Sequence, residues 1–213
     1  MISNERIFTY LESLFPNAHC ELEYTKDYEL LIAIILSAQC TDKRVNIVTR
    51  ELFKKYTTLE SINTASLKDI ENEIKSLGLF KNKAKSIKET VRIIIEDYDG
   101  IIPRDKKLLT NLPGVGNKTA NVFRAEWFKE PEIAVDTHVA RVSKRLGLAD
   151  ENDDVSIVEK KLRKKLKQEQ YIKAHHLLIH FGRYFCKAVN PNCKECQLKD
   201  MCKLYNSKLT RKS

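Results

Sequence analysis

Apolar residues recur at the spacing of an α-helix along most of this chain. In the segment 82–98, one face is apolar and the other faces are mostly charged. The apolar face consists of Ala84, Ile87, Val91, Ile94 and Tyr98. The segment 28–36 is apolar on nearly every side, which predicts a helix buried at the centre of a domain. No strand-like alternation persists, so the pattern predicts an all-α fold.

A second periodic segment, 155–166, has apolar residues on one face and five lysines or arginines on another. Asp153 or Asp154 can cap its start, and Ser156 with Glu159 has the spacing of a capping box. The basic face is interpreted as a solvated helix surface rather than a specific DNA contact. Three glycines are expected at helix ends, namely Gly78, Gly100 and Gly147.

Composition narrows the class of protein. The 213 residues are enough for one large or two small domains, and 42% of them are hydrophobic, so a substantial core can form. The formal charge, 38 − 29 = +9, favours a polyanionic partner, although a generally lysine-rich proteome would give the same excess. The longest apolar run, 30–36, is far shorter than a membrane span. We therefore expect an intracellular protein that does not enter a membrane.

A short glycine-containing turn lies between two predicted helices. Residues 112–121 are Leu-Pro-Gly-Val-Gly-Asn-Lys-Thr-Ala-Asn, preceded by a possible helix at 106–111 and followed by one at 118–127. Glycine allows close approach of the backbone to another surface, and the free N–H groups at the start of the second helix can bind a phosphate. Such contacts grip DNA without reading its sequence. The alternative is an ordinary corner between helices whose glycines serve packing alone.

Four cysteines lie within 17 residues, spaced C-x6-C-x2-C-x5-C. They are Cys186, Cys193, Cys196 and Cys202. With no secretory signal, a metal centre is favoured over disulfides. The uneven spacing favours an iron–sulfur cluster and leaves zinc open, because zinc ligands usually occur as two close pairs. Cys20 and Cys40 lie outside the motif and are expected to be buried as small apolar residues.

These motifs, taken together, resemble the endonuclease III family of DNA glycosylases, which carry a helix-hairpin-helix and a cluster loop. The matching segments run in one order through nearly the whole chain. They are "LSAQCTDKRVN" (36–46), "LGLFKNKA" (77–84), "LPGVGNKTAN" (112–121), "VDTHVARV" (135–142), "HHLLIHFGRYFC" (175–186) and the cysteine pattern. The resemblance implies that the four cysteines bind a [4Fe–4S] cluster.

The resemblance assigns the chemistry to Lys118 and Asp136. A neutral lysine amine can displace a damaged base at the sugar C1′ and form a Schiff base, which permits β-elimination of the 3′ phosphate. Lysine, with a pKa of about 10.4, is ordinarily protonated, and the start of a helix disfavours that charge. Asp136 would stabilise positive charge on the sugar. Local sequence alone favours a phosphate contact for Lys118 and a helix cap for Asp136.

The resemblance also implies which residues contact DNA. Gln39 would fill the gap left by the extruded nucleotide, and Leu79 would wedge between bases. Without the family, Gln39 is a polar residue at a helix end and Leu79 a core contact. The other implied contacts are Leu112, Gly114, Val115, Gly116 and Thr119 in the hairpin, with Arg183 and Lys187 near the cysteines. Four of the five histidines, namely His138, His175, His176 and His180, are expected to be structural.

By resemblance, residues 21–131 form a six-helix barrel carrying the helix-hairpin-helix (about 106–127). Residues 1–20 with 132–213 form a second helical domain holding the cluster loop (186–202), and the substrate lies in a cleft between the two. The implied activity is excision of oxidised pyrimidines from double-stranded DNA, followed by cleavage of the abasic site, by a monomer in the cytoplasm and nucleoid. Two alternatives remain: the adenine-glycosylase branch, which lacks the Schiff-base lysine, and a DNA-binding or electron-transfer iron–sulfur protein without glycosylase activity.

Overall fold

The computed structural model describes residues 4–210, and within this range every regular element is helical. The all-α prediction is therefore confirmed. The chain divides into two compact units, one formed by Glu21–Glu130 and the other by Met1–Cys20 together with Pro131–Ser213. We refer to them as the hairpin unit and the cysteine unit; the outermost residues of the latter, 1–3 and 211–213, lie outside the described residues. No helix in the described range is long and apolar enough to cross a membrane.

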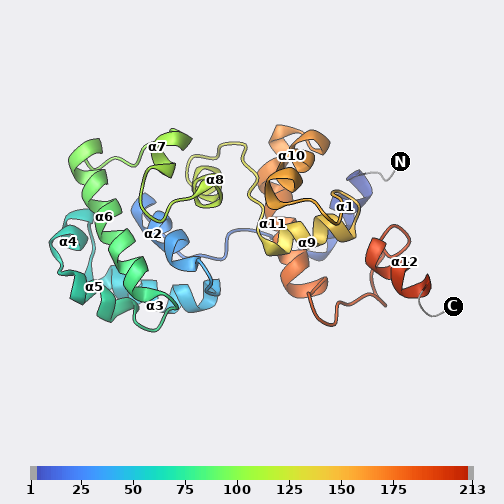
Figure 1. Ribbon diagram of the computed structural model, residues 1–213, viewed down its shortest axis with the longest axis horizontal. Helices are drawn as coiled ribbons and strands as arrows, with labels where there is room; N and C mark the ends of the chain where they lie inside the picture. Colours follow the sequence, from blue (N-terminus) through green and yellow to red (C-terminus); the bar gives the residue numbers. More distant parts are fainter. Residues whose placement is uncertain (1–3, 211–213) are drawn as a thin grey trace. The chain divides into compact units, whose positions relative to one another are not determined.

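The hairpin unit is built around one apolar helix. Its elements are α2 (Asp27–Ser37), α3 (Asp42–Lys55), α4 (Leu59–Thr64), α5 (Leu67–Ile74), α6 (Phe80–Tyr98), α7 (Lys106–Thr110) and α8 (Asn117–Glu126). Every residue of α2 from Tyr28 to Leu36 is buried, as its continuous apolar sequence predicts. Helix α2 packs against α3, α6 and α8 (Figure 1). Helix α8, which follows the glycine-containing turn, therefore shares a core with α3 and α6.

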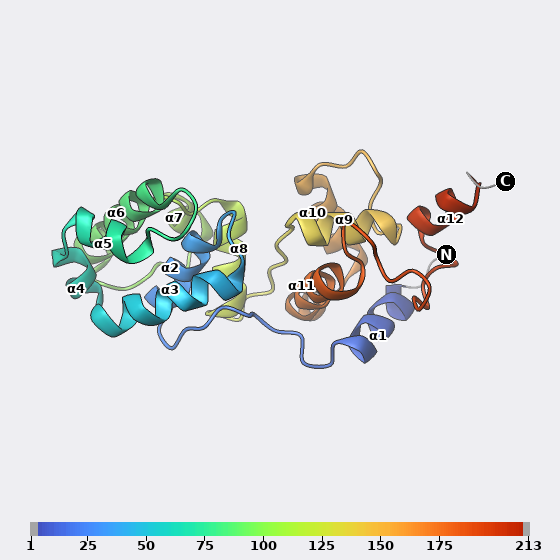
Figure 2. The ribbon, with the colours of Figure 1, turned by 90° about the horizontal axis from the view of Figure 1, so that it is seen from below.

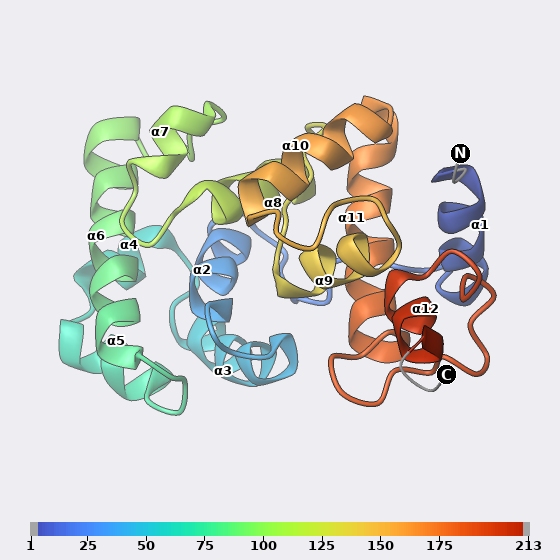
Figure 3. The same ribbon diagram turned by 45° about the vertical axis from the view of Figure 1, so that its right-hand side comes forward.

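The cysteine unit combines the two ends of the chain. Its elements are α1 (Asn4–Leu14), α9 (Thr137–Arg145), α10 (Val155–Lys165), the 3₁₀ turn η1 (Gln168–Gln170), α11 (Tyr171–His180), the π-helical segment η2 (Phe181–Phe185) and α12 (Lys203–Thr210). Helix α1 packs on α11 (Figure 2), and α12 packs on α9 (Figure 3). The N-terminal helix contributes Ile7 and Leu11, both fully buried, to the core of this unit.

The start of α10 differs in detail from its predicted form. Asp154 is the N-cap, and its Oδ1 accepts a hydrogen bond from the Ile157 N–H at 2.9 Å. The Ser156 hydroxyl also donates to Asp154, whereas Glu159 accepts from Arg163 Nε at 2.9 Å. The predicted capping box of Ser156 and Glu159 is therefore wrong. An aspartate two residues earlier already caps the helix, so Ser156 lies inside its first turn.

Candidate functional site

The turn between α7 and α8 is packed tightly onto the hairpin unit. Gly114 has φ of +80°, and a Cβ there would lie 3.0 Å from Ser86 Cβ on α6 and 3.3 Å from Ile35 Cγ2 on α2. Thr90 on α6 donates a hydrogen bond to the Pro113 carbonyl at 2.8 Å. Glycine is required at position 114 both for its backbone conformation and for this close approach. The turn therefore packs directly on two helices, α2 and α6.

Two of the predicted DNA contacts point inward. The side chains of Leu112 and Val115 are 2% and 4% exposed, and the Val115 N–H donates to the Leu112 carbonyl at 3.0 Å. Their side chains belong to the core and shape the turn, so the predicted DNA contact at these two positions would have to use the backbone. The exposed parts of the turn are Gly114 and Gly116, and Thr119 is half-buried. Sequence reasoning could not separate these roles, because all five residues belong to the same motif.

Helix α8 begins without a side-chain cap. Gly116 is its N-cap, in an extended conformation, and the helical hydrogen bonds begin with the Ala120 N–H donating to the Gly116 carbonyl at 2.9 Å. The N–H groups of the first turn are therefore left for an external acceptor. Lys118 lies in this first turn and is exposed. The arrangement provides an anion-binding helix start with an accessible amine beside it.

Asp136 caps the start of α9 in the cysteine unit. Its Oδ1 accepts hydrogen bonds from the N–H groups of His138 at 2.9 Å and Val139 at 2.8 Å. The other carboxylate oxygen takes no part in this cap, and the side chain is only half-buried. The interpretation of Asp136 as a helix cap is therefore correct, and it leaves one oxygen for a second role.

The histidines serve packing and hydrogen bonding. The ring of His175 lies 2.9 Å from the Ala134 carbonyl, and that of His180 lies 3.0 Å from the His19 carbonyl. His138 Nδ1 is 3.2 Å from Arg141 Nη2. Burial lowers the pKa of His138, and the charge of Asp136 acts in the opposite direction. These contacts support the expectation that the histidines are structural.

Two left-handed turns of the hairpin unit present Gln39 and Leu79. Both residues have φ of 58°, which side chains rarely adopt. Gln39 is exposed in the turn between α2 and α3, and Leu79 is the N-cap of α6 with 57% of its surface exposed. The interpretation of Leu79 as a core contact is therefore wrong. An exposed apolar side chain on a constrained turn is suited to insertion between bases.

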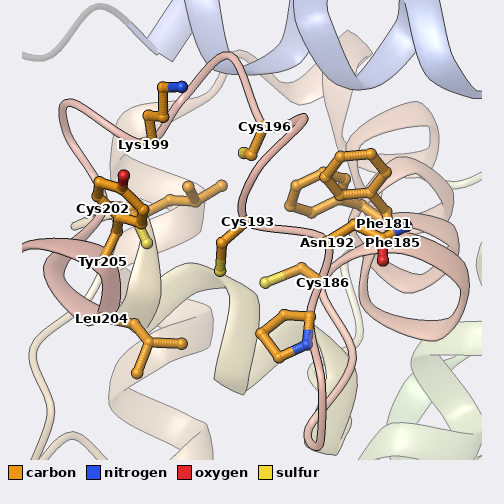
Figure 4. A pocket seen from close by; sticks show the side chains of 12 residues that line it. Phe181, Phe185, Cys186, Asn192, Cys193, Cys196, Lys199, Cys202, Leu204 and Tyr205 are labelled. Atoms are coloured by element: carbon orange, nitrogen blue, oxygen red, sulfur yellow. The ribbon is translucent and has the colours of Figure 1, made fainter. Parts of the chain in front are cut away.

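The four cysteines of the motif line one cavity in the cysteine unit (Figure 4). Their sulfur atoms point into the same space, which measures about 350 Å³ with its open part included. All four thiols are free, and the remaining wall is mainly apolar, with Leu146, Phe181, Phe185 and Leu204. Burial raises the pKa of the Cys186 and Cys196 thiols. Bound metal would favour the thiolates that burial disfavours.

The four thiols around this cavity are candidate ligands for a metal centre. Among residues 4–210, no three His, Cys, Asp or Glu side chains form a group that could hold one metal ion. A zinc ion would draw its sulfur ligands to about 2.3 Å from one centre. The cavity nonetheless has four cysteines around it, as a cluster of several irons requires. The residues present therefore match the donor set that an iron–sulfur cluster uses.

Two arginines that sequence reasoning missed tie the cysteine loop to α9. Arg145 donates to the carbonyls of Cys186 and Lys187 at 3.2 and 2.7 Å, and to Cys186 Sγ at 3.3 Å. Arg141 donates to the Gly182 carbonyl at 2.7 Å. The only signal in the sequence was their spacing of four residues along the helix that follows Asp136. They position the loop on the same helix that Asp136 caps.

The basic residues beside the cysteines lie at the surface of this loop. Lys187, directly after Cys186, is exposed, and Arg183 in η2 is half-buried. The two remaining cysteines differ from expectation: Cys20 and Cys40 are half-buried, not fully buried. Each lies in a loop or turn outside the core helices, where a neighbouring surface covers only part of the side chain.

Comparison with known proteins agrees with these motifs. Residues 32–168 match the HhH-GPD superfamily base excision DNA repair protein family. The chain is 51% identical over 190 residues to endonuclease III of Bacillus subtilis, covering 89% of this chain and 87% of that one. Two solved structures are similar, both at 45% identity. A non-covalent endonuclease III–DNA complex has a TM-score of 0.94, with 99% of this chain and 100% of the other covered. A trapped endonuclease III–DNA covalent intermediate has a TM-score of 0.93, with 98% of this chain and 100% of the other covered.

Proposed function

Because the chain belongs to the endonuclease III family within the HhH-GPD superfamily of base excision DNA repair proteins, we propose that it excises oxidised pyrimidines from duplex DNA and cleaves the resulting abasic site. The observation that carries this proposal is the start of α8. An uncapped helix N-terminus suited to phosphate lies beside the exposed amine of Lys118. We propose that the protein acts as a monomer on DNA inside the cell.

Lys118 is the proposed nucleophile. Its neutral amine attacks the sugar C1′, the bond from C1′ to the base breaks, and the base leaves with its electron pair and takes up a proton. The C1′–O4′ bond of the sugar ring then breaks: the nitrogen lone pair forms a C=N double bond to C1′, and O4′ takes up a proton as a hydroxyl group, which gives the Schiff base with Lys118. The neighbouring C2′ proton is then acidic enough for β-elimination, which expels the 3′ phosphate. Hydrolysis of the imine finally releases the lysine.

Asp136 is the proposed electrostatic partner. The oxygen that does not cap α9 can face the positive charge that develops on the sugar as the base departs. The same carboxylate can pass protons during ring opening. Its fixed cap hydrogen bonds would hold the side chain in one orientation, so little reorganisation is needed when charge develops.

The remaining contacts serve capture of the nucleotide. Gln39 is proposed to fill the gap that the extruded nucleotide leaves in the base stack, and Leu79 to wedge between neighbouring bases. The N–H groups after Gly116 are proposed to bind a phosphate. Arg183 and Lys187 are proposed to contact phosphates from the cysteine unit. Leu112 and Val115 support the turn from within, as their burial indicates.

The four cysteines are proposed to hold a [4Fe–4S] cluster. When bound, such a cluster crosslinks four thiolates and thereby fixes the loop between Cys186 and Cys202. Arg145 and the apolar wall of the cavity support this loop from α9 and η2. The lyase chemistry assigned to Lys118 and Asp136 uses no electron transfer.

The test is borohydride trapping on duplexes that carry either one thymine glycol or one abasic site. Wild type, Lys118→Gln and the control Lys107→Gln, which removes the same charge from an exposed site on α7, are compared side by side. We expect covalent adducts with both duplexes for wild type and Lys107→Gln and none for Lys118→Gln.

An adduct with the abasic duplex alone would leave the lyase intact and overturn the assignment of oxidised pyrimidines. No adduct from wild type that still binds DNA would overturn the bifunctional mechanism. That result would favour a monofunctional glycosylase or a non-catalytic iron–sulfur protein.

A further inference from the structure

A buried lysine contacts the cysteine beside Gln39. Lys83 in the first turn of α6 is 5% exposed, and its Nζ donates a hydrogen bond to Cys40 Sγ at 3.2 Å. Within residues 4–210, the structure gives this ammonium group no other hydrogen-bond acceptor. An ammonium group carries three N–H donors, and burying it with few acceptors is costly. In the part of the chain that the structure describes, the Cys40 sulfur is therefore the acceptor available to this buried group.

The contact joins the two left-handed turns of the hairpin unit. Cys40 directly follows Gln39, and its N–H donates to the Ser37 carbonyl at 3.0 Å at the end of α2. The Lys83 N–H donates to the Leu79 carbonyl at 3.0 Å. Both turns hold a side chain at a positive φ, a conformation that persists only where surrounding contacts enforce it. The Lys83 side chain supplies such a contact across a separation of 43 residues in sequence.

We propose that the contact between Lys83 and Cys40 holds the Gln39 turn against the start of α6, and that a small disulfide which modifies the Cys40 thiol releases this turn. The consequence is weaker capture of the extruded nucleotide. This inference rests on the proposed function, because it uses the DNA-contacting roles of Gln39 and Leu79. It adds a positioning residue, Lys83, and a thiol-modification site, Cys40.

The modification is an ordinary thiol–disulfide exchange. The Cys40 sulfur forms a bond to one sulfur of the small disulfide, the disulfide's own S–S bond breaks, and its other half leaves as a thiol with the Cys40 proton. Cys40 is half-buried, so part of the side chain is open to a reagent. The added group would compete with Lys83 for the space around a sulfur only 3.2 Å away. Displacement would leave a buried ammonium group unpaired, so the turn must shift.

The first arm of the test uses variants of the pair. Lys83→Met removes the ammonium, Cys40→Ala removes the acceptor, and Cys40→Ser keeps an acceptor. We expect Lys83→Met and Cys40→Ala to lower kcat/KM on a damaged duplex by about tenfold, with Cys40→Ser restoring most of it. The lyase rate on a single-stranded abasic oligonucleotide should stay within about twofold for all three, because no stack has to be filled there.

Equal losses on duplex and single-stranded substrates would overturn the positioning role, since a general folding defect affects both. Unchanged duplex activity in Lys83→Met and Cys40→Ala would also overturn it. If wild type lacks lyase activity on either substrate, the proposed function itself fails. The contact is then tested by thermal unfolding alone, where Cys40→Ala should be less stable than Cys40→Ala combined with Lys83→Met.

The second arm uses methyl methanethiosulfonate as the probe on the protein as isolated. This reagent places a methylthio group on the Cys40 sulfur, as a small disulfide would, and its sulfonyl half leaves as methanesulfinic acid with the Cys40 proton. Peptide mass spectrometry identifies the modified cysteines, and Cys20→Ser serves as the control for the other half-buried thiol. We expect Cys40 to be modified and duplex activity to fall in wild type and Cys20→Ser, to recover on reduction, and to be unaffected in Cys40→Ser. Loss of activity in Cys40→Ser as well, or modification of Cys40 without loss, would overturn the modification site.

Discussion

The helices α8 and α9 begin in opposite ways. Helix α8 starts at Gly116, which has no side chain to cap it, so the N–H groups of its first turn are left open. Helix α9 starts at Asp136, whose carboxylate accepts two N–H groups of its own helix. Each start lies in a motif that carries a residue proposed for chemistry: that of α8 in 112–121 with Lys118, and that of α9 in 135–142 with Asp136.

The difference shows how one structural element serves two purposes. An open helix start attracts an external anion, whereas a capped start fixes the orientation of its own carboxylate. The open start costs the protein some stability and leaves N–H groups that are suited to a phosphate. The capped start gains stability, and its spare oxygen provides a negative charge in a fixed position. The following predictions test this contrast, beginning with the largest effect.

The largest effect is expected for Asp136→Asn. Asparagine caps a helix about as well as aspartate, so the free energy of unfolding should change by less than about 0.5 kcal/mol. The negative charge is lost, and base excision should fall about a hundredfold or more. Single-turnover excision and thermal unfolding measure the two quantities separately.

Asp136→Ala provides the comparison, because it removes both the charge and the cap. It should match Asp136→Asn in activity and lose a further ~1 kcal/mol of stability. If Asp136→Asn retained full excision, the spare oxygen would have no catalytic role.

The second prediction converts the start of α8 into one like that of α9. Gly116 has an extended backbone, and a Cβ there meets nothing within 4 Å, so Gly116→Asp fits without strain. The new cap should raise the free energy of unfolding by about 0.3 kcal/mol. It also places a negative charge where phosphate is proposed to bind, so DNA affinity should fall by about tenfold.

Gly116→Ser is the matched control, since it supplies a cap without charge. It should give the same gain in stability and a smaller loss of affinity. Affinity can be measured by fluorescence anisotropy at fixed salt. Unchanged affinity in Gly116→Asp would show that the open helix start does not bind DNA.

The smallest effect concerns pH and His138, which lies in the first turn of α9. Burial is the main cause that lowers the pKa of His138, aided by Arg141 and Arg183 and opposed by Asp136. The folded protein therefore binds fewer protons at this site than the unfolded chain. Stability should decline as the pH falls below the unfolded value of about 6.5, and this residue should have no influence above it.

His138→Gln should flatten that part of the stability profile measured by chemical denaturation between pH 5 and 8. The start of α8 lacks a neighbouring histidine in its motif, so Gly116→Ser should leave the slope unchanged. An identical slope in wild type and His138→Gln would assign the pH dependence to other groups.

Much of the fold followed from local patterns. The buried helix at 28–36, the periodic helix at 82–98 and the short helices around the turn all formed where apolar spacing and glycine predicted them. The apolar face that a helix buries repeats every three to four residues along the chain, so a linear pattern contains it. Asp154 caps α10 as one of the two predicted candidates, whereas the capping box of Ser156 and Glu159 did not form, because adjacent polar residues compete for the same N–H groups.

The sequence by itself determined the all-α class and the cysteine motif, because each is a matter of residue type and short spacing. The roles proposed for Lys118 and Asp136 came from the resemblance of nearly the whole chain to one family. Only the tertiary structure decided which residues of the matching motifs face inward. Leu112 and Val115 are buried while Leu79 is exposed, although all three are apolar. It alone brought Lys83 to Cys40, and Arg145 to the cysteine loop. Such contacts join residues more than 40 positions apart, and they depend on how helices pack, which no local pattern records.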